Sequence, residues 1–234
     1  MSKPLTYYFS DLRKGLCFAI ILLIGMQMWG CSWFRKTEER ETARELAELG
    51  MEDYKDGDYE DAIESFQNLR DWYPFSQYAI LAELKLGDAH YYRKEYEEAI
   101  VAYETFEKLH PKNDATPYVV YKIGRCYFDR IQTIDRDQTM AREALKAFQR
   151  LVRTHPSSQY ATKAEEHIRI CHKNLAEHDF YVGMFYYKSK HYRAALERFK
   201  SVVTSYPDIG VHHKALKYIA LCQEKLNSAI LGED

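Results

Sequence analysis

The 234-residue sequence lacks the charge surplus and the strand patterning that are typical of several common classes of protein. Its 33 lysine and arginine residues nearly balance 35 aspartate and glutamate residues, which leaves a net charge of −2. A nucleic-acid-binding domain usually carries a basic surplus, so nucleic-acid partners are not expected. Only 10 glycines occur, and no segment alternates apolar and polar residues as a half-buried strand does. The chain is therefore predicted to be all-α.

Motifs for catalysis are also missing from the sequence. It contains no Gly-rich phosphate loop, no G-x-S-x-G and no H-E-x-x-H. His167 and Cys171 lie four residues apart on a predicted helix, with His172 and His178 close by, which is the spacing of a metal pair. A catalytic zinc would also need a third ligand and a base. We therefore predict that the chain is not an enzyme and that it has no metal or other cofactor.

One long apolar stretch is present near the start of the chain. Residues 16–34 contain no charge, and Lys3, Arg13 and Lys14 precede them. Its most apolar part, residues 16–28, has the length of a secretory signal rather than of a membrane span. Gly30 and Cys31 follow, so the segment resembles a bacterial lipoprotein signal in which the cysteine becomes lipidated. We predict a signal peptide at residues 1–30, lipidation of Cys31 and a linker at residues 31–40.

Two details bear on this N-terminal prediction. Met28 and Trp29 stand where a leucine and a small residue are usual in lipoprotein signals. An uncleaved signal anchor therefore remains the alternative. Ser32 follows the cysteine, where an aspartate usually signals inner-membrane retention in lipoproteins. The resemblance therefore implies an outer-membrane location.

An internal repeat organises the rest of the chain. A glycine, an alanine and a proline recur with a spacing of about twelve residues, and an aromatic residue follows each alanine by four. In the third repeat, an insertion around "IQTIDRDQ" lengthens the first interval. The pattern resembles the tetratricopeptide repeat, in which small residues allow two antiparallel helices to cross closely and proline ends the second helix. The repeat positions are Gly50, Ala62, Phe66, Pro74; Gly87, Ala99, Tyr103, Pro111; Gly124, Ala144, Phe148, Pro156; and Gly183, Ala195, Phe199, Pro207.

These repeats predict an all-α solenoid of about ten helices in five pairs. We divide it into N-terminal repeats at residues 41–156 and C-terminal repeats at residues 157–228. Beyond Pro156 the pairing stays open, because "ATKAEEHIRICHKNL" and "AEHDFYVGMFYYKSK" both have the pattern of a first helix. Cys126, Cys171 and Cys222 occupy one repeat position, and equivalent positions lie too far apart for a disulfide. We therefore predict buried structural thiols.

The 20 tyrosines suggest a binding surface as well as packing. At the offsets from the repeat glycine that line the concave groove in tetratricopeptide proteins, the sequence places aromatic and basic residues together. Aromatic side chains give large contact area at low entropy cost, and cations beside them can hold a carboxylate. We predict that the groove binds an aromatic-rich peptide with a free C-terminus, although plain packing would use the same residues. The candidates are Tyr54, Lys55, Lys85, Tyr91, Tyr92, Tyr118, Tyr121, Lys122, Arg125 and Phe128.

Several longer segments narrow the resemblance to one family. With the lipoprotein signal and the repeats, "WYPFSQYA", "IDRDQTMAREALKAFQRLV", "HPSSQYA" and "KHYRAALERFKSVVTSYP" make the chain similar to the BamD (ComL) family of lipoproteins. This resemblance implies a non-enzymatic scaffold of the outer-membrane β-barrel assembly machinery, lipid-anchored in the outer membrane and facing the periplasm.

The same resemblance implies partners. They are the POTRA region of a BamA-like barrel protein, the C-terminal signals of nascent barrel proteins, and accessory Bam lipoproteins. Arg198 in "LERFK" aligns with a basic residue of the family motif, which makes it our candidate for the BamA-like contact. The alternative function is another envelope scaffold, such as a Tol-Pal-associated or cell-division protein. Those proteins usually carry a coiled coil, and residues 37–49 are too short for sustained heptads.

Overall fold

The structure is a computed structural model that describes residues 41–231. The predicted signal peptide, the lipidation site Cys31 and the linker therefore lie outside the described residues. The first described helix begins after Thr42, whose side-chain oxygen accepts a hydrogen bond from the Glu45 backbone at 3.3 Å. Glu45 returns the contact by accepting from the Thr42 backbone N–H at 2.7 Å. This capping box fixes where that helix starts.

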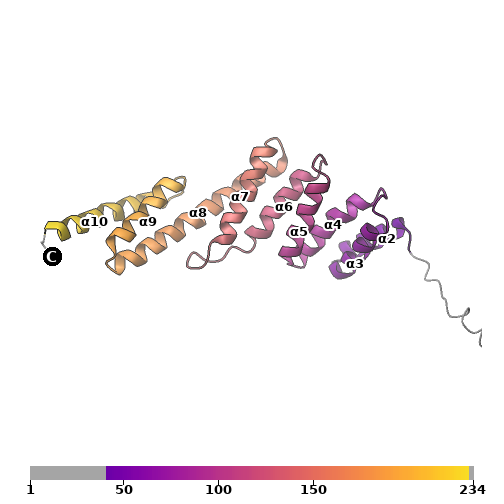
Figure 1. The fold of residues 1–234 in the computed structure, drawn as a ribbon, viewed down its shortest axis with the longest axis horizontal. Helices are drawn as coiled ribbons and strands as arrows, with labels where there is room; N and C mark the ends of the chain where they lie inside the picture. The colour runs from indigo at the N-terminus through magenta and orange to yellow at the C-terminus, as the bar shows by residue number, and fades with distance from the viewer. Residues whose placement is uncertain (1–40, 232–234) are drawn as a thin grey trace, which may run out of the picture. The chain divides into compact units, whose positions relative to one another are not determined.

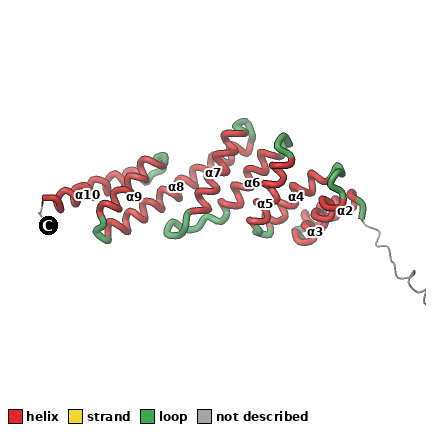
Figure 2. The backbone as a smooth tube through the Cα atoms, viewed as in Figure 1, coloured by secondary structure: helices red, strands yellow, loops and turns green. Residues whose placement is uncertain are grey.

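Residues 41–231 fold into helices joined by short turns, and no strand occurs in this part (Figure 2). The helices follow one another along one axis, each packed against its neighbours in the sequence (Figure 1). The prediction of an all-α solenoid is confirmed. The helices are α2 (Ala43–Asp56), α3 (Tyr59–Trp72), α4 (Ala79–Tyr92), α5 (Tyr96–Leu109), α6 (Thr116–Phe128), α7 (Thr139–Thr154), α8 (Gln159–Lys188), α9 (Tyr192–Ser205) and α10 (His212–Leu231).

The repeat glycines are the points of closest approach within each helix pair. A Cβ atom added to Gly87 would lie 2.5 Å from a ring carbon of Tyr103, and one on Gly124 would lie 2.5 Å from Phe148. Gly50 and Gly183 face the aromatic residue of their own repeat in the same way. All four aromatic rings are fully buried. The glycine and the aromatic residue thus form one interlocked contact in every repeat, as the spacing predicted.

The repeat prolines end the second helix of each pair. Each lies two residues beyond the last helical residue of α3, α5, α7 or α9. Proline has no N–H to donate and restricts the residue before it, so a helix does not continue through this position. The sequence therefore predicted these helix ends correctly.

Helix α8 differs from the prediction of separate helices after Pro156. The two segments that each resembled a first helix form one continuous helix of 30 residues. No glycine or proline stands between Pro156 and Gly183 to end it. Ala164 and Cys171 in its first half pack in a cluster with α6 and α7, whereas Ala176 in its second half packs with α9 and α10. One helix therefore takes part in two neighbouring repeats.

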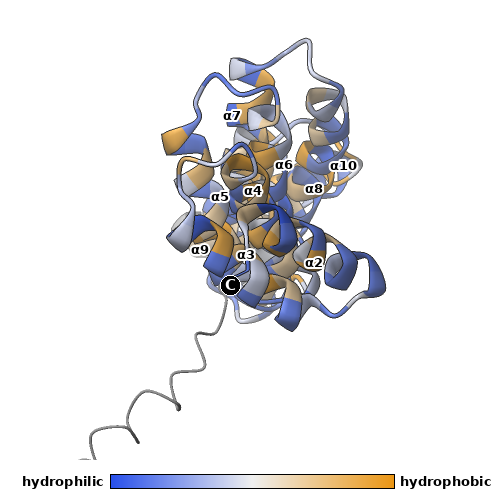
Figure 3. Cartoon of the chain, turned by 90° about the vertical axis from the view of Figure 1, so that its right-hand side faces the viewer, coloured by the Kyte–Doolittle hydropathy of each residue, from blue (hydrophilic) through white to orange (hydrophobic). Residues whose placement is uncertain are grey.

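Hydrophobic and hydrophilic residues alternate in patches along the helices rather than forming uninterrupted apolar cylinders (Figure 3). Such a pattern is typical of helices that bury one stripe and leave the other in water. Within residues 41–231, no helix is both long and apolar enough to cross a membrane.

Candidate functional site

Five tyrosines from helices α2 to α5 form a continuous set of ring contacts, which we call the tyrosine cluster. Tyr59 and Tyr92 stack with ring centroids 5.2 Å apart. Tyr54 meets both rings edge-on, and Tyr91 meets Tyr92 and Tyr96 in the same way. Tyr92 is 51% exposed, so the cluster reaches the surface. The structure thus brings together Tyr54, Tyr91 and Tyr92 of the predicted groove.

A second set of rings, the central aromatic cluster, joins helices α6, α7 and α8, and Phe148 is its member on α7. Tyr160 contacts both Tyr118 and Tyr121, with centroids 5.4 and 5.6 Å away. His167 lies over Phe128 at 4.5 Å and beside Tyr121 at 5.8 Å. The Tyr121 hydroxyl and His167 Nε2 are 3.0 Å apart, within hydrogen-bond distance. Three further predicted residues, Tyr118, Tyr121 and Phe128, therefore lie in this second cluster.

The buried carboxylate of Asp88 links the two clusters. One of its oxygens accepts hydrogen bonds from the hydroxyls of Tyr103 at 2.7 Å and Tyr118 at 2.5 Å. The other accepts from Lys85 Nζ at 2.9 Å. Lys85 Nζ also lies 4.4 Å from the ring centroid of Tyr54. A charge buried to 1% exposure is tolerated here because three donors surround it.

Lys122 differs from the predicted cations Lys85 and Arg125 because no carboxylate is bonded to it. Its side chain is 6% exposed, and its ammonium nitrogen lies 3.1 Å from the ring centroid of Tyr91 and 5.1 Å from that of Tyr92. Among the described residues, Nζ makes no hydrogen bond or ion pair. Burial lowers its pKa to about 8, although the nearby charge of Asp88 opposes this. An ammonium held only by ring faces keeps its hydrogen-bonding capacity for a ligand.

Arg125 is already engaged within the protein. Its Nη2 donates to both oxygens of Asp129 at 2.9 and 3.1 Å, and the Tyr91 hydroxyl also donates to Asp129. Burial and this hydrogen bond raise the pKa of the Tyr91 hydroxyl, which stays protonated as the donor. Asp129 therefore orients Tyr91 beneath Lys122, and Arg125 balances the charge of Asp129.

Two predicted site residues lie away from these clusters. Lys55 is exposed and lines a separate hollow with Met51 and Leu81. Arg198 lies on α9, where its Nη1 donates to Asp179 at 3.0 Å while 46% of its side chain stays exposed. Ser201 and Tyr206 donate to the same carboxylate. Arg198 thus has an intramolecular role beside the contact predicted for it.

Several residues that organise the site are not marked by the repeat pattern of the sequence. Asp88 and Asp129 were not recognised, because their partners Tyr118 and Tyr91 are 30 and 38 residues away in the chain. Tyr160 was missed because it follows the third proline rather than a repeat glycine. A single acidic residue next to a repeat glycine, as Asp88 is to Gly87, was the one available signal.

The possible metal ligands have structural surroundings. His167 is packed among aromatic rings, and burial and the charge of Arg125 lower its pKa. His178 contacts the backbone oxygen of Ile134 at 2.6 Å through Nδ1. Across residues 41–231, no group of three or more His, Cys, Asp or Glu side chains could hold a metal ion. Cys126, Cys171 and Cys222 are buried free thiols, and burial raises the pKa of each.

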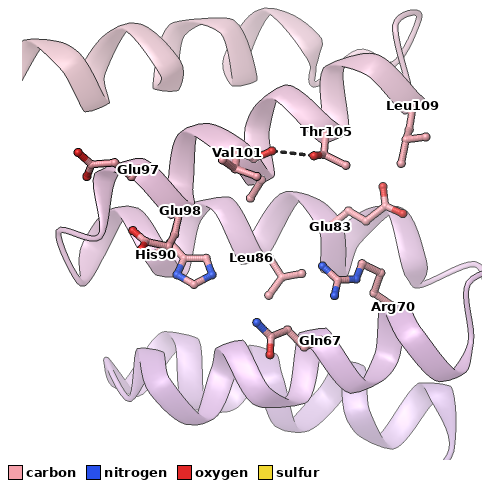
Figure 4. Close-up of a pocket in the computed structure, with 11 residues that line it drawn as sticks. Gln67, Arg70, Glu83, Leu86, His90, Glu97, Glu98, Val101, Thr105 and Leu109 are labelled. Carbon is pink, nitrogen blue, oxygen red and sulfur yellow. Dashed lines mark hydrogen bonds between the residues drawn. The ribbon is translucent and has the colours of Figure 1, made fainter. Parts of the chain in front are cut away.

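A hollow of about 360 Å³ lies between α3, α4 and α5 (Figure 4). Leu86, Val101 and Leu109 are among its apolar lining residues. Glu83 is already paired with His110 at 2.6 Å, and His90 with Glu95 at 2.8 Å. None of the residues predicted from the sequence lines this hollow, and paired charges leave little for a ligand to bind.

A larger hollow of about 570 Å³ lies on the C-terminal repeats, between α8 and the α9–α10 turn. Phe180, Tyr181 and Met184 of α8 give it an apolar wall. Three lysines and one glutamate also line it, so the charge of the lining is net positive. The insertion in the third repeat reaches it through Ile134. The other lining residues are Lys173, Glu177, Lys188, Ile209, Gly210, Val211 and Lys214.

Paired helices in series, with a glycine–aromatic contact in each repeat, define a tetratricopeptide-like solenoid. The TPR2AB-domain–pHSP90 complex of yeast Sti1 has a similar fold, with a TM-score of 0.50 at 16% identity, over 80% of this chain and 71% of that one. The family is identified from sequence. The chain belongs to the YfiO family, described as outer membrane lipoprotein, whose model matches residues 39–229.

Curated relatives agree with this family. The outer membrane protein assembly factor BamD of Caulobacter vibrioides is 28% identical over 223 residues, which cover 90% of this chain and 73% of the relative. The protein of the same name from Pasteurella multocida is 28% identical over 226 residues, covering 92% of this chain and 86% of the relative. The resemblance to the BamD family drawn from the sequence is therefore confirmed.

Proposed function

We propose that this chain is an outer-membrane protein assembly factor whose N-terminal repeats hold the C-terminal segment of unfolded barrel proteins. Family membership supports the assembly role over a Tol-Pal-associated or cell-division role. The tyrosine cluster and the central aromatic cluster supply stacking surfaces for aromatic side chains of such a segment. Lys122 between them supplies the positive charge for its terminal carboxylate.

Lys122 is the observation that carries this proposal. Burying an ammonium without an anion is costly, and the pKa of about 8 reflects that cost. A peptide carboxylate that reached Nζ would form a charge-assisted hydrogen bond in a site of low exposure, where such bonds are strong. The neighbouring cations have less capacity to bind a peptide carboxylate, because Lys85 is already paired with Asp88 and Arg125 with Asp129.

The test is a comparison of two peptides on two proteins. A barrel-derived peptide that ends in an aromatic residue is prepared with a free carboxylate and as the C-terminal amide, and anisotropy measures binding to the full chain. We expect the wild type to bind the free acid roughly tenfold more tightly, as expected for a charge-assisted hydrogen bond worth about 1.4 kcal/mol. Lys122→Met should remove this preference and leave the amide affinity unchanged.

Lys55→Met is the matched control, because it removes an exposed lysine outside both clusters. It should keep the preference for the free acid. Equal binding of acid and amide by the wild type would contradict carboxylate recognition. If Lys122→Met still prefers the free acid over the amide, another cation binds the carboxylate and this role of Lys122 is wrong.

We further propose that the C-terminal repeats dock on the POTRA region of a BamA-like barrel protein. The basic hollow beside α8 supports this, since its apolar wall and lysine rim suit an acidic, partly apolar surface. Arg198 remains our candidate for a further contact through the exposed part of its guanidinium. Lys188→Glu with Lys214→Glu should reduce co-purification of the barrel partner from membranes, while Lys146→Glu, on α7, should not.

The anchor of this scaffold is proposed to be a lipidated Cys31, with the repeats facing the periplasm. A single acyl chain binds a membrane only marginally, whereas two or more give stable anchoring. Mass spectrometry of the mature N-terminus should find a diacylglyceryl group and an N-acyl chain on Cys31. An intact residue 1 and an unmodified Cys31 would support the uncleaved signal anchor instead.

A further inference from the structure

The turn between α3 and α4 exposes a large apolar side chain without cover. Phe75 lies in this turn and is 101% exposed. Ile80 and Leu81, in the first turn of α4, are 42% and 36% exposed. Trp72, at the end of α3, is 41% exposed. Exposed apolar patches on folded domains often mark surfaces that contact another protein or a membrane.

The repeat itself provides the comparison that makes this turn unusual. The residue after the repeat proline is exposed in all four repeats, but only the first repeat has an apolar residue there. The positions that match Ile80 and Leu81 are polar in the last two repeats. Repeat packing therefore does not require an apolar residue at these places. The matching positions are Phe75, Lys112, Ser157 and Asp208 after the prolines, and Thr162, Lys163, His213 and Lys214 on the later helices.

This turn lies at the same end of the first repeat as the start of α2. Ala43, in the first turn of α2, packs in one cluster with Tyr73 and Tyr78 of the α3–α4 turn. Glu48 and Leu81 line one hollow between α2 and α4. Figure 2 shows the α3–α4 turn beside the start of α2.

The length of chain before α2 limits how far this end can be from Cys31. Thr42 follows Cys31 by eleven residues. An extended chain advances at most about 3.6 Å per residue, so the start of α2 lies within about 40 Å of a lipid attached at Cys31. The apolar turn belongs to the repeat that directly follows this stretch of chain.

We propose that the α3–α4 turn contacts the lipid surface in which Cys31 is anchored, with Phe75 entering the headgroup region and Ile80 and Leu81 beside it. The inference rests on the proposed lipidation. Phenylalanine and leucine side chains are typical of segments that insert into the boundary between the headgroups and the acyl chains. One phenylalanine would bind weakly alone, but the tether makes the contact intramolecular and raises its effective concentration. The contact would fix how the first repeat is oriented on the membrane.

The test uses full-length, lipidated protein reconstituted into vesicles of phosphatidylethanolamine and phosphatidylglycerol. Phe75→Cys is labelled with an environment-sensitive fluorophore, and Lys112→Cys at the matching turn of the next repeat is the control. The three buried thiols should not react, since they are fully buried and burial raises their pKa. We expect a blue shift at position 75 on reconstitution, and quenching by nitroxide lipids. The label at position 112 should show neither.

Flotation of the same vesicles separates the two hypotheses. The protein could float while the label at position 75 shows no more blue shift than the label at position 112. This result would overturn the membrane contact and leave the anchor intact. Protein that fails to float would overturn the anchor and, with it, this inference. A blue shift without lipids that grows with protein concentration would assign the turn to contact between copies of the chain and would also overturn it.

Discussion

At the scale of single residues, the candidate site combines two carboxylates that are paired within the protein and one buried ammonium that is not. Asp88 and Asp129 each collect donors from several helices, so their charges are satisfied within the protein. Lys122 is buried near both carboxylates yet bonded to neither, and it rests on Tyr91. Composition and spacing brought Lys122 into the candidate set, but its lack of a partner depends on three-dimensional contacts that one sequence does not contain.

Lys122→Met should stabilise the fold at neutral pH while it weakens binding. The folded pKa of about 8 lies below the ordinary value of 10.5, so the unfolded chain binds more protons between these values. Stability of the wild type should therefore rise with pH through this window. The variant removes the cost of burying the charge, with a gain of roughly 1–3 kcal/mol at pH 7 that shrinks toward pH 10.5.

Urea unfolding of both proteins at pH 7 and pH 10 measures this difference. A variant that is less stable than the wild type at pH 7 would mean that the contact with Tyr91 outweighs the cost of burial. Lys55→Met, at an exposed position, should leave stability unchanged at both pH values.

At the scale of helices, one glycine–aromatic contact repeats in every pair, and this explains why the sequence predicted most of the fold. The spacing from glycine to alanine to proline marks a close crossing and a helix end without reference to distant residues. Helix α8 was not predicted as one helix, because two segments of similar pattern could each begin a pair. The absence of glycine and proline between residues 157 and 182 was the signal for a continuous helix.

Gly87→Val should destabilise the protein by about 1–3 kcal/mol, as overpacking does. The added Cβ would meet the Tyr103 ring at 2.5 Å, and Asp88 holds the hydroxyl of that ring, so the ring has little freedom to move. Thermal unfolding measures the loss. Tyr103→Leu in the same chain makes room, so the double variant should lose less than the sum of the two single variants. Strict additivity would show that the two residues do not press on each other.

The insertion between α6 and α7 is closed by a single buried amide. Gln138 is 2% exposed, and its Nε2 donates to the backbone oxygens of Thr133 and Arg136, each at 3.0 Å. Gln138→Ala should cost about 1–2 kcal/mol, because the hydrogen bonds to the Thr133 and Arg136 carbonyl oxygens are lost and only the Arg136 backbone N–H still donates to Thr133. Hydrogen exchange should quicken in residues 131–138 and stay unchanged in α3. Gln132→Ala, at an exposed neighbour, is the control, and equal exchange in both variants would contradict this role.

At the scale of the whole molecule, three surfaces would serve one process from different repeats. The first repeat carries the apolar turn and the chain from Cys31, the middle repeats carry Lys122, and the C-terminal repeats carry the basic hollow. Because α8 belongs to two repeats, it connects the central aromatic cluster with the wall of that hollow. The sequence suggested Cys31 and Lys122 through motifs, but the exposure of the apolar turn and the hollow beside α8 depend on how the helices pack.

Depletion of the protein in cells should lower the level of outer-membrane porins and leave inner-membrane proteins intact. Unchanged porins would contradict the assembly role. Wild-type protein supplied in trans should restore the porins, whereas Lys122→Met should restore them only in part, although it is folded and anchored. Immunoblots of fractionated membranes measure both the porins and the variant itself. Full restoration by Lys122→Met would contradict only the proposal that Lys122 binds the carboxylate. The anchor and the C-terminal docking surface are unchanged in that variant, so the proposals about them would stand.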